Sequence, residues 1–249
     1  MSEIRLKLHP RQSLAFLSKA TEILYGGAAG GGKSHLMRVV AIMLCMAVAG
    51  LQVYIFRRVS DDLRKNHLEG SSGLRAMLAS LTDSGHCKFN DSKGIFEFWN
   101  GAKIYLCHCQ HEKDMYKYQG AEIHVLLMDE LTLFTETIYR FLRGRVRLGG
   151  MKVPDKYKGK LPMILCGSNP GNIGHAWVKK TFVDFAPPME ITRTPAAEGG
   201  MLRQYIPAKL ADNPTLTEND PDYESRLEGL GNPALVAAMK NGDSDIIDG

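Results

Sequence analysis

The stretch ILYGGAAGGGKSHLMRVV, residues 23–40, decides the fold. Three apolar residues lead into a loop of glycine and alanine that ends in Lys33 and Ser34, and apolar residues follow at helical spacing. Residues 27–34 fit the pattern G-x-x-x-x-G-K-[ST] at every fixed position. Main-chain N–H groups can turn inward around a polyanion at φ values that glycine adopts cheaply. The sequence therefore predicts a phosphate-binding loop between a strand and a helix; a flexible glycine turn is the alternative.

This loop and the start of the helix supply the candidate nucleotide contacts. The helix points its partly positive N-terminal end at the same phosphates. Lys33 would reach the β- and γ-phosphates, and Ser34 would give one oxygen to Mg²⁺. The candidate nucleotide-binding residues of this segment are Gly27, Ala28, Ala29, Gly30, Gly31, Gly32, Lys33, Ser34 and, in the first helical turn, His35.

A second motif, IHVLLMDE at residues 123–130, supplies carboxylates. Its apolar run is typical of a buried parallel strand, and such a strand ends at the sheet edge where open α/β proteins place ligands. We expect Asp129 to hold Mg²⁺ through its water shell and Glu130 to orient and polarise the attacking water. The catalytic residues are then Glu130 and Lys33. An acidic helix cap after a core strand is the alternative.

Other segments indicate an α/β fold. Strand-like runs at residues 51–59 and 161–166 alternate with helical stretches, which predicts a mostly parallel central sheet flanked by helices. Residues 88–109 alternate apolar and polar side chains around Asn100-Gly101, the pattern of a β-hairpin with a two-residue loop. Met37, Met43 and Met46 fit core packing in the helix after the glycine-rich loop.

The segment GSNPG, residues 167–171, breaks a strand at the edge expected beside the γ-phosphate. Ser168 and Asn169 could sense that phosphate and pass its loss to a moving part. A plain Asn-Pro-Gly turn is the alternative.

Composition is that of an ordinary soluble globular protein: 249 residues, 44% hydrophobic, 23% charged, with a net charge of +4. Such a charge does not mark a nucleic-acid binder, although it leaves room for a local basic patch. The longest apolar run, residues 39–51, is shorter than the roughly 20 residues of a bilayer span, so we expect no membrane partner. Five cysteines, an odd number, indicate reduced thiols in a cytoplasmic compartment.

The chain changes character near residue 212, where DNPTLTENDPDY is polar and turn-like. We therefore expect a domain at 1–211 and a C-terminal subdomain or linker at 212–249, with one or two short helices from residue 223 onward.

Six segments together resemble the large subunit of tailed-bacteriophage terminases, the ATP-driven motors that package DNA into procapsids. They are LHPRQ (8–12), YGGAAGGGKS (25–34), VYIFRRV (53–59), VLLMDE (125–130), CGSNPG (166–171) and MKNGDSDIIDG (239–249). The resemblance implies a P-loop NTPase of the ASCE, RecA-like type that hydrolyses ATP, with Mg²⁺, to translocate double-stranded DNA. It makes Gln12 the candidate adenine contact, and Ser168 and Asn169 the coupling motif.

The resemblance also implies partners and a location. Besides double-stranded DNA, the implied partners are the portal protein, the small terminase subunit and further copies of the chain in a ring. The ring would be a pentamer when assembled, whereas the isolated domain would be a monomer. The implied place of action is the host cytoplasm, docked on the procapsid. Family members carry a nuclease domain after the glycine-aspartate tail, so we expect no nuclease activity from these residues.

The sequence departs from the family at two places. Many terminases have an arginine inside the P-loop, and this chain has alanine and glycine there; Ser244 replaces a common tryptophan in the tail. Another arginine must then stabilise the transition-state charge, supplied either in cis or by a neighbouring subunit. The candidates are Arg58, Arg143, Arg145 and Arg147, for each of which a solvated surface position is the alternative.

Two other functions use the same motifs. A helicase-like or AAA-type ATPase would remodel nucleic acid or protein, but it would need a second RecA-like domain or a helical lid with a sensor. A nucleotide-gated binding module would have no need of Glu130.

Overall fold

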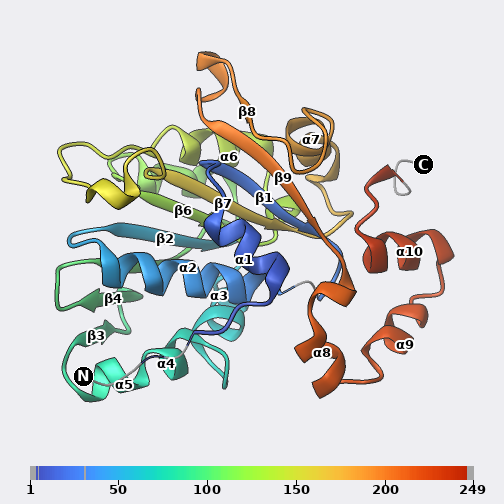
Figure 1. Ribbon diagram of the computed structural model, residues 1–249, viewed down its shortest axis with the longest axis horizontal. Helices are drawn as coiled ribbons and strands as arrows, with labels where there is room; N and C mark the ends of the chain where they lie inside the picture. Colours follow the sequence, from blue (N-terminus) through green and yellow to red (C-terminus); the bar gives the residue numbers. More distant parts are fainter. Residues whose placement is uncertain (1–3, 5, 31, 246–249) are drawn as a thin grey trace. The chain divides into compact units, whose positions relative to one another are not determined.

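The computed structural model describes residues 4, 6–30 and 32–245. The chain divides into two compact units. The first comprises Met1–Lys7, Ser34–Asp129 and Thr137–Leu165, and the second comprises Leu8–Lys33, Glu130–Glu136 and Cys166–Gly249. Nine strands and many short helices alternate along the described part of the chain (Figure 1).

The first unit contains five strands in the spatial order β3-β4-β5-β2-β6. Strand β2 pairs in parallel with both β5 and β6, whereas β3, β4 and β5 are antiparallel. The bounds are Gln52–Arg57 for β2, Cys87–Asn90 for β3, Ile95–Phe98 for β4, Lys103–His108 for β5 and Val125–Met128 for β6. All four residues of β6 are buried, as expected for a strand inside a parallel sheet.

The helices of the first unit are α2 and seven shorter segments. Their bounds are Lys33–Ala47 for α2, Ser60–Leu63 for α3, Arg64–Leu68 for the π-helix η1, Leu74–Met77 for α4, Ala79–Asp83 for α5, Glu112–Tyr118 for η2, Glu136–Arg143 for α6 and Asp155–Tyr157 for η4. Helix α2 supplies much of the core, through Leu36, Val40 and Ile42 among others. Met43 does not share in this core and is 41% exposed, because six residues after Met37 rotate the side chain by about 240°.

The predicted hairpin is confirmed, but its loop has three residues and not two. The N–H of Phe98 donates to the carbonyl of Ala102 at 2.8 Å, and the N–H of Gly101 donates to the carbonyl of Phe98 at 2.9 Å. Residues 99–101 therefore form the loop, with Gly101 at φ 80°, a position that glycine occupies without a Cβ penalty. The Asn100 side chain donates to the carbonyl of Cys45 in α2 at 2.8 Å and so ties the turn to that helix.

The second unit is built on β1 and β9, which pair in parallel, with β8 antiparallel to β9. Strand β7 has three residues in each unit. The strand bounds are Glu22–Gly27 for β1, Met163–Ser168 for β7, Thr192–Arg193 for β8 and Leu202–Ala208 for β9. The remaining elements are α1 (Pro10–Leu17), η3 (Leu131–Leu133), α7 (His175–Val178), η5 (Lys179–Val183), η6 (Ala196–Glu198), η7 (Leu210–Asp212), α8 (Pro214–Asn219), α9 (Tyr223–Glu228) and α10 (Pro233–Asn241).

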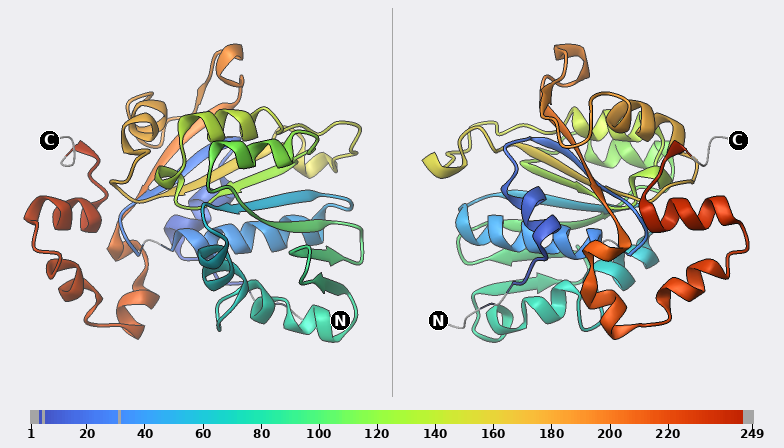
Figure 2. Two further views of the ribbon diagram at one scale, coloured as in Figure 1. Left: turned by 180° about the vertical axis from the view of Figure 1, so that it is seen from behind. Right: turned by 45° about the vertical axis from the view of Figure 1, so that its right-hand side comes forward.

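Helices α8, α9 and α10 follow one another at the end of the described chain (Figure 2). Leu227 of α9 and Leu210 form a small apolar cluster with Ala29, against which Leu216 and Met239 also pack. The C-terminal helices are thus anchored on the glycine-rich loop by apolar contacts.

The strand order and the parallel pairing confirm the predicted α/β fold of the P-loop NTPase type. The strands predicted at residues 23–25, 51–59, 123–128 and 161–166 all form, as does the helix after the glycine-rich loop. Among the described residues, no helix has both the length and the apolar character needed to cross a membrane.

A buried ion pair links neighbouring strands of the second unit. Glu22 of β1 lies opposite Arg203 of β9 in the register, and the Nε of Arg203 donates to a carboxylate oxygen of Glu22. The two side chains are 0% and 3% exposed. The guanidinium also donates to the carbonyl of Thr181 at 3.0 Å and lies over the ring of Phe185.

We predict that Glu22→Gln lowers the free energy of unfolding by about 3 kcal/mol, because it leaves the Arg203 charge buried without its counter-ion. Urea unfolding followed by circular dichroism measures the change. The control is Asp91→Asn, which removes a solvent-exposed partner of Arg64 and should cost less than about 1 kcal/mol. Equal losses in the two variants would contradict the prediction.

Candidate functional site

The glycine-rich loop begins where β1 ends. Gly27, Gly30 and Gly32 have φ values of 116°, 69° and 77°, which lie in the region that favours glycine. A Cβ on Gly26 would lie 2.5 Å from Cδ of Lys33 and 2.6 Å from the carbonyl oxygen of Ser168. A Cβ on Gly30 or on Gly32 would likewise lie 2.4 Å from a neighbouring side-chain atom, so these glycines have no room for a side chain. The fourth predicted glycine, Gly31, lies outside the described residues.

Side chains from distant segments hold the carbonyls of this loop. The Nε2 of Gln12 donates to the carbonyl of Gly32 at 2.9 Å, and the Nδ2 of Asn213 donates to the carbonyl of Gly30 at 2.7 Å. The main-chain N–H groups of Ala28 and Ala29 also have partners, because they donate to the carbonyls of Ala208 at 3.1 Å and Met239 at 2.7 Å. A phosphate would therefore have to be bound by N–H groups elsewhere in the loop, or displace these bonds.

Ala28, Ala29 and Lys33 are the loop residues other than glycine that precede Ser34. Ala28 and Ala29 are buried, and the Nζ of Lys33 donates to the carbonyl of Ala28. The ammonium group is thus folded over the loop. His35 is placed differently, because its Nε2 lies 2.8 Å from the carbonyl of Lys7. A nucleotide contact of His35 would therefore have to use its main-chain N–H.

Gln12 is buried in α1 and both ends of its amide are engaged. Its Oε1 accepts from the N–H of His9 at 2.7 Å, closing the N-terminal turn of the helix. Its Nε2 is the group that bonds Gly32. The residue predicted as the adenine contact therefore lies directly against the glycine-rich loop.

Asp129 is a buried carboxylate, 1% exposed, at the end of β6. Its Oδ2 accepts hydrogen bonds from three side chains: Ser34 Oγ at 2.7 Å, Arg57 at 2.9 Å and His67 Nε2 at 2.7 Å. Burial alone would raise the pKa of Asp129, but the hydrogen bond from His67, the Arg57 charge and the hydrogen bond from Ser34 hold that pKa well below its usual range. The group is therefore an ionised carboxylate.

A divalent cation fits the pair formed by Ser34 and Asp129. Both present oxygen, the ligand type that Mg²⁺ prefers, and their oxygens are 2.7 Å apart. Because Oδ2 already accepts hydrogen bonds from Ser34, Arg57 and His67, Ser34 would bind the ion directly and Asp129 would hold it through a coordinated water molecule. The donor set present thus suits the predicted metal.

Glu130, the next residue, has an unusual backbone. Its φ and ψ are 52° and 58°, the left-handed region, which costs a non-glycine residue roughly 1–3 kcal/mol. The carbonyl of Glu130 accepts from the N–H of Leu133 at 2.9 Å, which starts the short helix η3. Such strain is concentrated at functional sites, where the surrounding structure imposes it.

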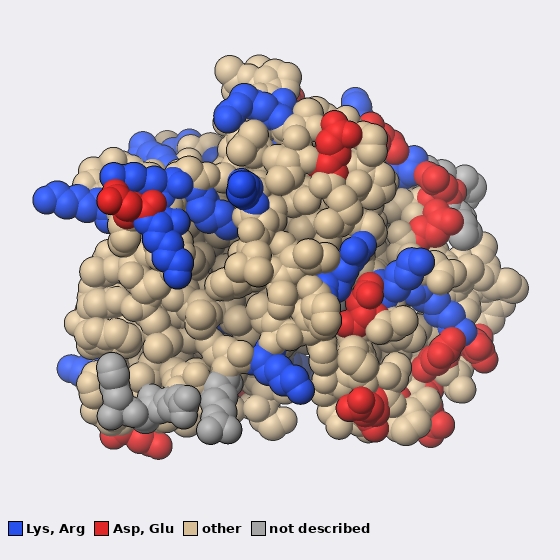
Figure 3. Space-filling model, viewed as in Figure 1, with Lys and Arg blue, Asp and Glu red and all other residues tan. Residues whose placement is uncertain are grey.

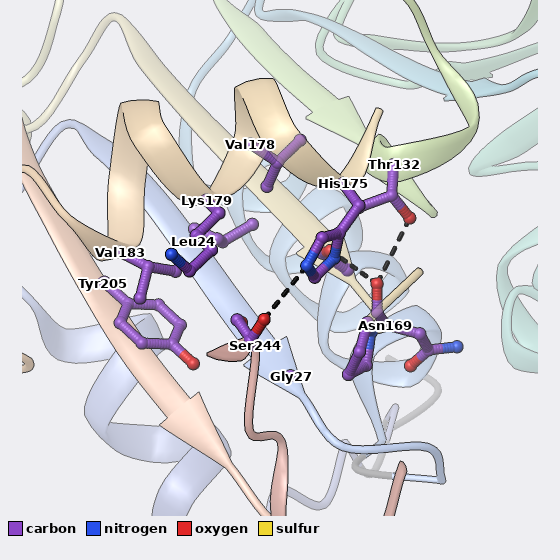
Figure 4. A pocket seen from close by; sticks show the side chains of 12 residues that line it. Leu24, Gly27, Thr132, Asn169, His175, Val178, Lys179, Val183, Tyr205 and Ser244 are labelled. Carbon is purple, nitrogen blue, oxygen red and sulfur yellow. Dashed lines mark hydrogen bonds between the residues drawn. The ribbon is translucent and has the colours of Figure 1, made fainter. Parts of the chain in front are cut away.

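Ser168 is the last residue of β7, and Asn169, which is labelled in Figure 4, follows it. The carbonyl of Asn169 accepts from Thr132 Oγ1 at 3.2 Å. Its side-chain Oδ1 is buried and has no hydrogen-bond partner among the described residues. A buried acceptor without a partner needs an explanation, and this one belongs to a residue that the sequence singled out.

His175 connects this loop to the chain's C-terminal segment. Its Nδ1 accepts from the N–H of Gly171 at 3.0 Å, which leaves Nε2 to donate to the carbonyl of Ser244 at 3.1 Å (Figure 4). Lys179, one turn further, forms an ion pair with Asp245 at 3.3 Å. The tail is thus held next to the loop after β7.

The four arginine candidates all lie in the first unit. Arg58 makes a long contact of 3.4 Å with the carbonyl of Gln110. Arg145 donates to the carbonyl of Gln119 at 2.7 Å, Arg143 lies over the ring of Tyr139, and Arg147 is exposed. The arginine that contacts Asp129 is none of these but Arg57.

Sequence reasoning missed Arg57 and His67 as parts of the site. A signal for Arg57 exists, because β2 and β6 are adjacent parallel strands in which Phe56 lies opposite Met128. The next residues, Arg57 and Asp129, are then neighbours at the carboxyl edge. His67 gives no such signal, since it sits in a π-helix that neither periodicity nor a motif marks.

A comparison with protein-family models finds one that matches residues 24–150, described as the N-terminal part of the T4likevirus-type terminase large subunit. A search of curated protein sequences found no match.

Three phage proteins are among the solved structures of similar fold. The large terminase of a thermophilic bacteriophage, in one of its crystal forms, has a TM-score of 0.66 at 14% identity, covering 96% of this chain and 54% of that protein. The large terminase ATPase domain of Thermus phage P74-26 has a TM-score of 0.59 at 13% identity, covering 96% and 94%. The large terminase of bacteriophage HK97 has a TM-score of 0.58 at 12% identity, covering 96% and 50%.

At these identities the likeness shows the fold, and this chain spans about half the length of the first and the third of these proteins. The family match covers just over half of the chain and includes both the glycine-rich loop from Leu24 onward and the Asp129-Glu130 pair. The chain therefore belongs to the T4-type terminase large subunit family and corresponds to its N-terminal part.

Proposed function

We propose that this chain is the ATPase motor domain of a terminase large subunit, which hydrolyses ATP to move double-stranded DNA into a procapsid. The observation that carries this proposal is the 2.7 Å hydrogen bond between Ser34 and Asp129. Lys33 directly precedes the serine and Glu130 directly follows the aspartate, so one contact ties the phosphate-binding motif to the acidic motif. The large terminase with the TM-score of 0.66, which has the same fold, was also solved with ATP-γ-S and with ADP.

The residues of the chain then have distinct roles. The backbone of the glycine-rich loop and Lys33 bind the phosphates, while Gln12 contacts the adenine. Ser34 and Asp129 hold Mg²⁺, which when bound neutralises charge that develops on the phosphate oxygens. Glu130 accepts a proton from the attacking water and orients it. The strained backbone conformation of Glu130 supports this role, because it fixes the direction in which the side chain leaves the main chain.

Ser168 and Asn169 form the coupling element in this proposal. The unpartnered Oδ1 of Asn169 offers an acceptor to a water molecule. The carbonyl of Ser168 lies so near Gly26, at the base of the glycine-rich loop, that no Cβ would fit there. A shift of the glycine-rich loop at Gly26 would therefore change its contact with the carbonyl of Ser168.

DNA contact is proposed for the long segment between α6 and β7. Residues 144–162 contain one acidic residue, Asp155, and six basic residues: Arg145, Arg147, Lys152, Lys156, Lys158 and Lys160. Lys and Arg side chains gather over this segment, drawn yellow in Figure 1 (Figure 3). Loops of this length with little regular structure are usually functional or disordered, and a basic loop suits the DNA phosphate backbone.

The remaining parts of the proposal concern assembly. The motor would act as a homo-oligomeric ring, pentameric when assembled, with the portal protein and the small terminase subunit as partners in the host cytoplasm. Residues 212–249 would form a subdomain that leads toward a nuclease domain. One of the arginines Arg58, Arg143, Arg145 or Arg147 would act on the γ-phosphate, either within the subunit or across a subunit boundary.

We predict that Glu130→Gln lowers the rate of ATP hydrolysis at least about 10²-fold, because the amide cannot accept the proton of the water. ATP affinity should change less than about threefold, since the phosphate cradle is untouched. Steady-state turnover and fluorescent-nucleotide binding measure the two quantities. Glu97→Gln, an exposed residue in β4, serves as the control. Wild-type turnover by the Glu130 variant in an assembled motor would refute its role.

A second prediction concerns the arginine. If a neighbouring subunit supplies it, ATP turnover per chain should rise more than about tenfold between dilute and concentrated protein, because an arginine finger contributes about 10³ to 10⁵ in rate. Nucleotide affinity should not change over the same range. Constant turnover at all concentrations would place the arginine within the subunit.

The basic segment gives a third prediction. The double variant Lys152→Ala, Lys156→Ala should reduce the slope of log K against log salt for duplex DNA by about 2, one for each lost phosphate contact. The control removes two exposed lysines elsewhere, Lys88 and Lys113. The same slope in both double variants would show that the segment does not contact DNA.

A further inference from the structure

A chain of three polar side chains ends on Asp129, and nothing in the sequence motifs accounts for it. His67 lies in the π-helix η1 with its side chain fully buried. Its Nε2 is 2.7 Å from Oδ2 of Asp129, while its Nδ1 is 3.4 Å from a guanidinium nitrogen of Arg38. Arg38 is itself buried and also donates to the carbonyl of Asn66 at 2.5 Å. The order is therefore Arg38, His67, Asp129.

The chemistry of the two end groups fixes the direction of these bonds. A guanidinium can only donate hydrogen bonds and an ionised carboxylate can only accept them. The imidazole must therefore accept at Nδ1 and donate from Nε2, which is one defined neutral tautomer. A ring held at both nitrogens has a fixed orientation, and so has the N–H that it aims at Asp129.

Helix α2 is connected to Asp129 in two ways, one direct and one indirect. Ser34 and Arg38 are four residues apart and lie on the same face of the helix. Ser34 reaches Oδ2 directly, whereas Arg38 reaches it through His67. One helix therefore sets both the direct hydrogen bond to the carboxylate and the indirect one.

The backbone of η1 forms a π-turn at His67. The N–H of Glu69 donates to the carbonyl of Arg64 at 2.9 Å, five residues back, which widens the turn. Both His67 and the adjacent Leu68 are fully buried as a result. Single π-turns are rare and frequently occur at functional sites.

We propose that Arg38 and His67 are positioning residues that hold the Asp129 carboxylate in the orientation required to bind Mg²⁺ with the nucleotide. The proposal rests on the proposed function of this site. Groups that form hydrogen bonds with a metal-binding side chain, and so orient it, typically contribute about 10- to 100-fold in metal affinity. Without the His67 donor, Oδ2 loses one of the hydrogen bonds that fix its orientation, and the carboxylate gains freedom to rotate.

Two substitutions that differ by one methylene group test the proposal. Glutamine can place an N–H near the position of the histidine Nε2 and can accept from Arg38, whereas asparagine is too short to reach Asp129. Fluorescent-nucleotide affinity is measured at increasing free Mg²⁺ and in EDTA. Mg²⁺ raises the nucleotide affinity of the wild type by some factor, and we expect that factor to be at least about tenfold smaller in His67→Asn. In EDTA the affinity of this variant should be within about twofold of wild type. We expect His67→Gln to keep most of the gain.

The chain contains a matched control for a merely structural histidine. His124 is also buried, its Nδ1 accepts from the N–H of Gln52 at 2.9 Å, and its Nε2 faces the carboxylate of Glu122 at 3.1 Å. His124→Asn should leave the Mg²⁺ dependence unchanged, even where it lowers the unfolding midpoint.

Three outcomes overturn the proposal: wild-type Mg²⁺ dependence in His67→Asn, equal losses in the asparagine and glutamine variants, or an equal loss in His124→Asn. If His67→Asn does not fold, Arg38→Met removes the other end of the chain of side chains and must show the same loss of Mg²⁺ dependence. A wild-type protein that binds no nucleotide at any Mg²⁺ concentration would instead refute the proposed function.

Discussion

The constraint on which the first unit depends is the buried, ionised carboxylate of Asp129. An ionised group at 1% exposure is stable only if hydrogen bonds and opposite charges replace its hydration. Asp129 receives a hydroxyl, a guanidinium and an imidazole on a single oxygen. These donors come from α2, β2 and the π-helix η1, so three separate segments must be in place before the carboxylate is satisfied. The requirements of one charge thus help to order the unit around it.

The register of the parallel strands supplies part of this arrangement. Phe56 of β2 lies opposite Met128 of β6, and the N–H of Asp129 donates to the carbonyl of Phe56 at 2.9 Å. A one-residue shift would turn every side chain of β6 to the other face. Because all of β6 is buried and apolar, its own side chains do not specify the register; the polar Asp129 does, since a shift would move its carboxylate away from Ser34, Arg57 and His67.

The features that the sequence predicted are those with local signals. The glycine-rich loop has a fixed spacing, β6 and β7 are short apolar runs, and the hairpin has Asn100-Gly101. The features that it missed depend on contacts between distant residues. Arg57 and Arg58 are indistinguishable in the sequence, and only the strand register directs Arg57 to Asp129. His67 is 62 residues from Asp129 and reaches it from a π-turn that no residue type marks. The hairpin loop was misjudged by one residue because glycine at positive φ suits loops of two and of three residues alike.

In the second unit, backbone N–H and carbonyl groups of the glycine-rich loop contact segments that follow much later in the chain. Asn213 bonds the carbonyl of Gly30, the N–H of Ala29 donates to the carbonyl of Met239 at 2.7 Å, and Gly242 lies against the backbone of Gly27. His175 bonds the loop after β7 to Ser244, three residues beyond Asn241, where α10 ends. The same short tail therefore touches both the phosphate-binding loop and the proposed coupling motif. Contiguity of this kind links the two loops through the tail. It requires that any rearrangement of either loop break these backbone contacts or carry the tail along, because a buried N–H or carbonyl cannot be left without a partner at small cost.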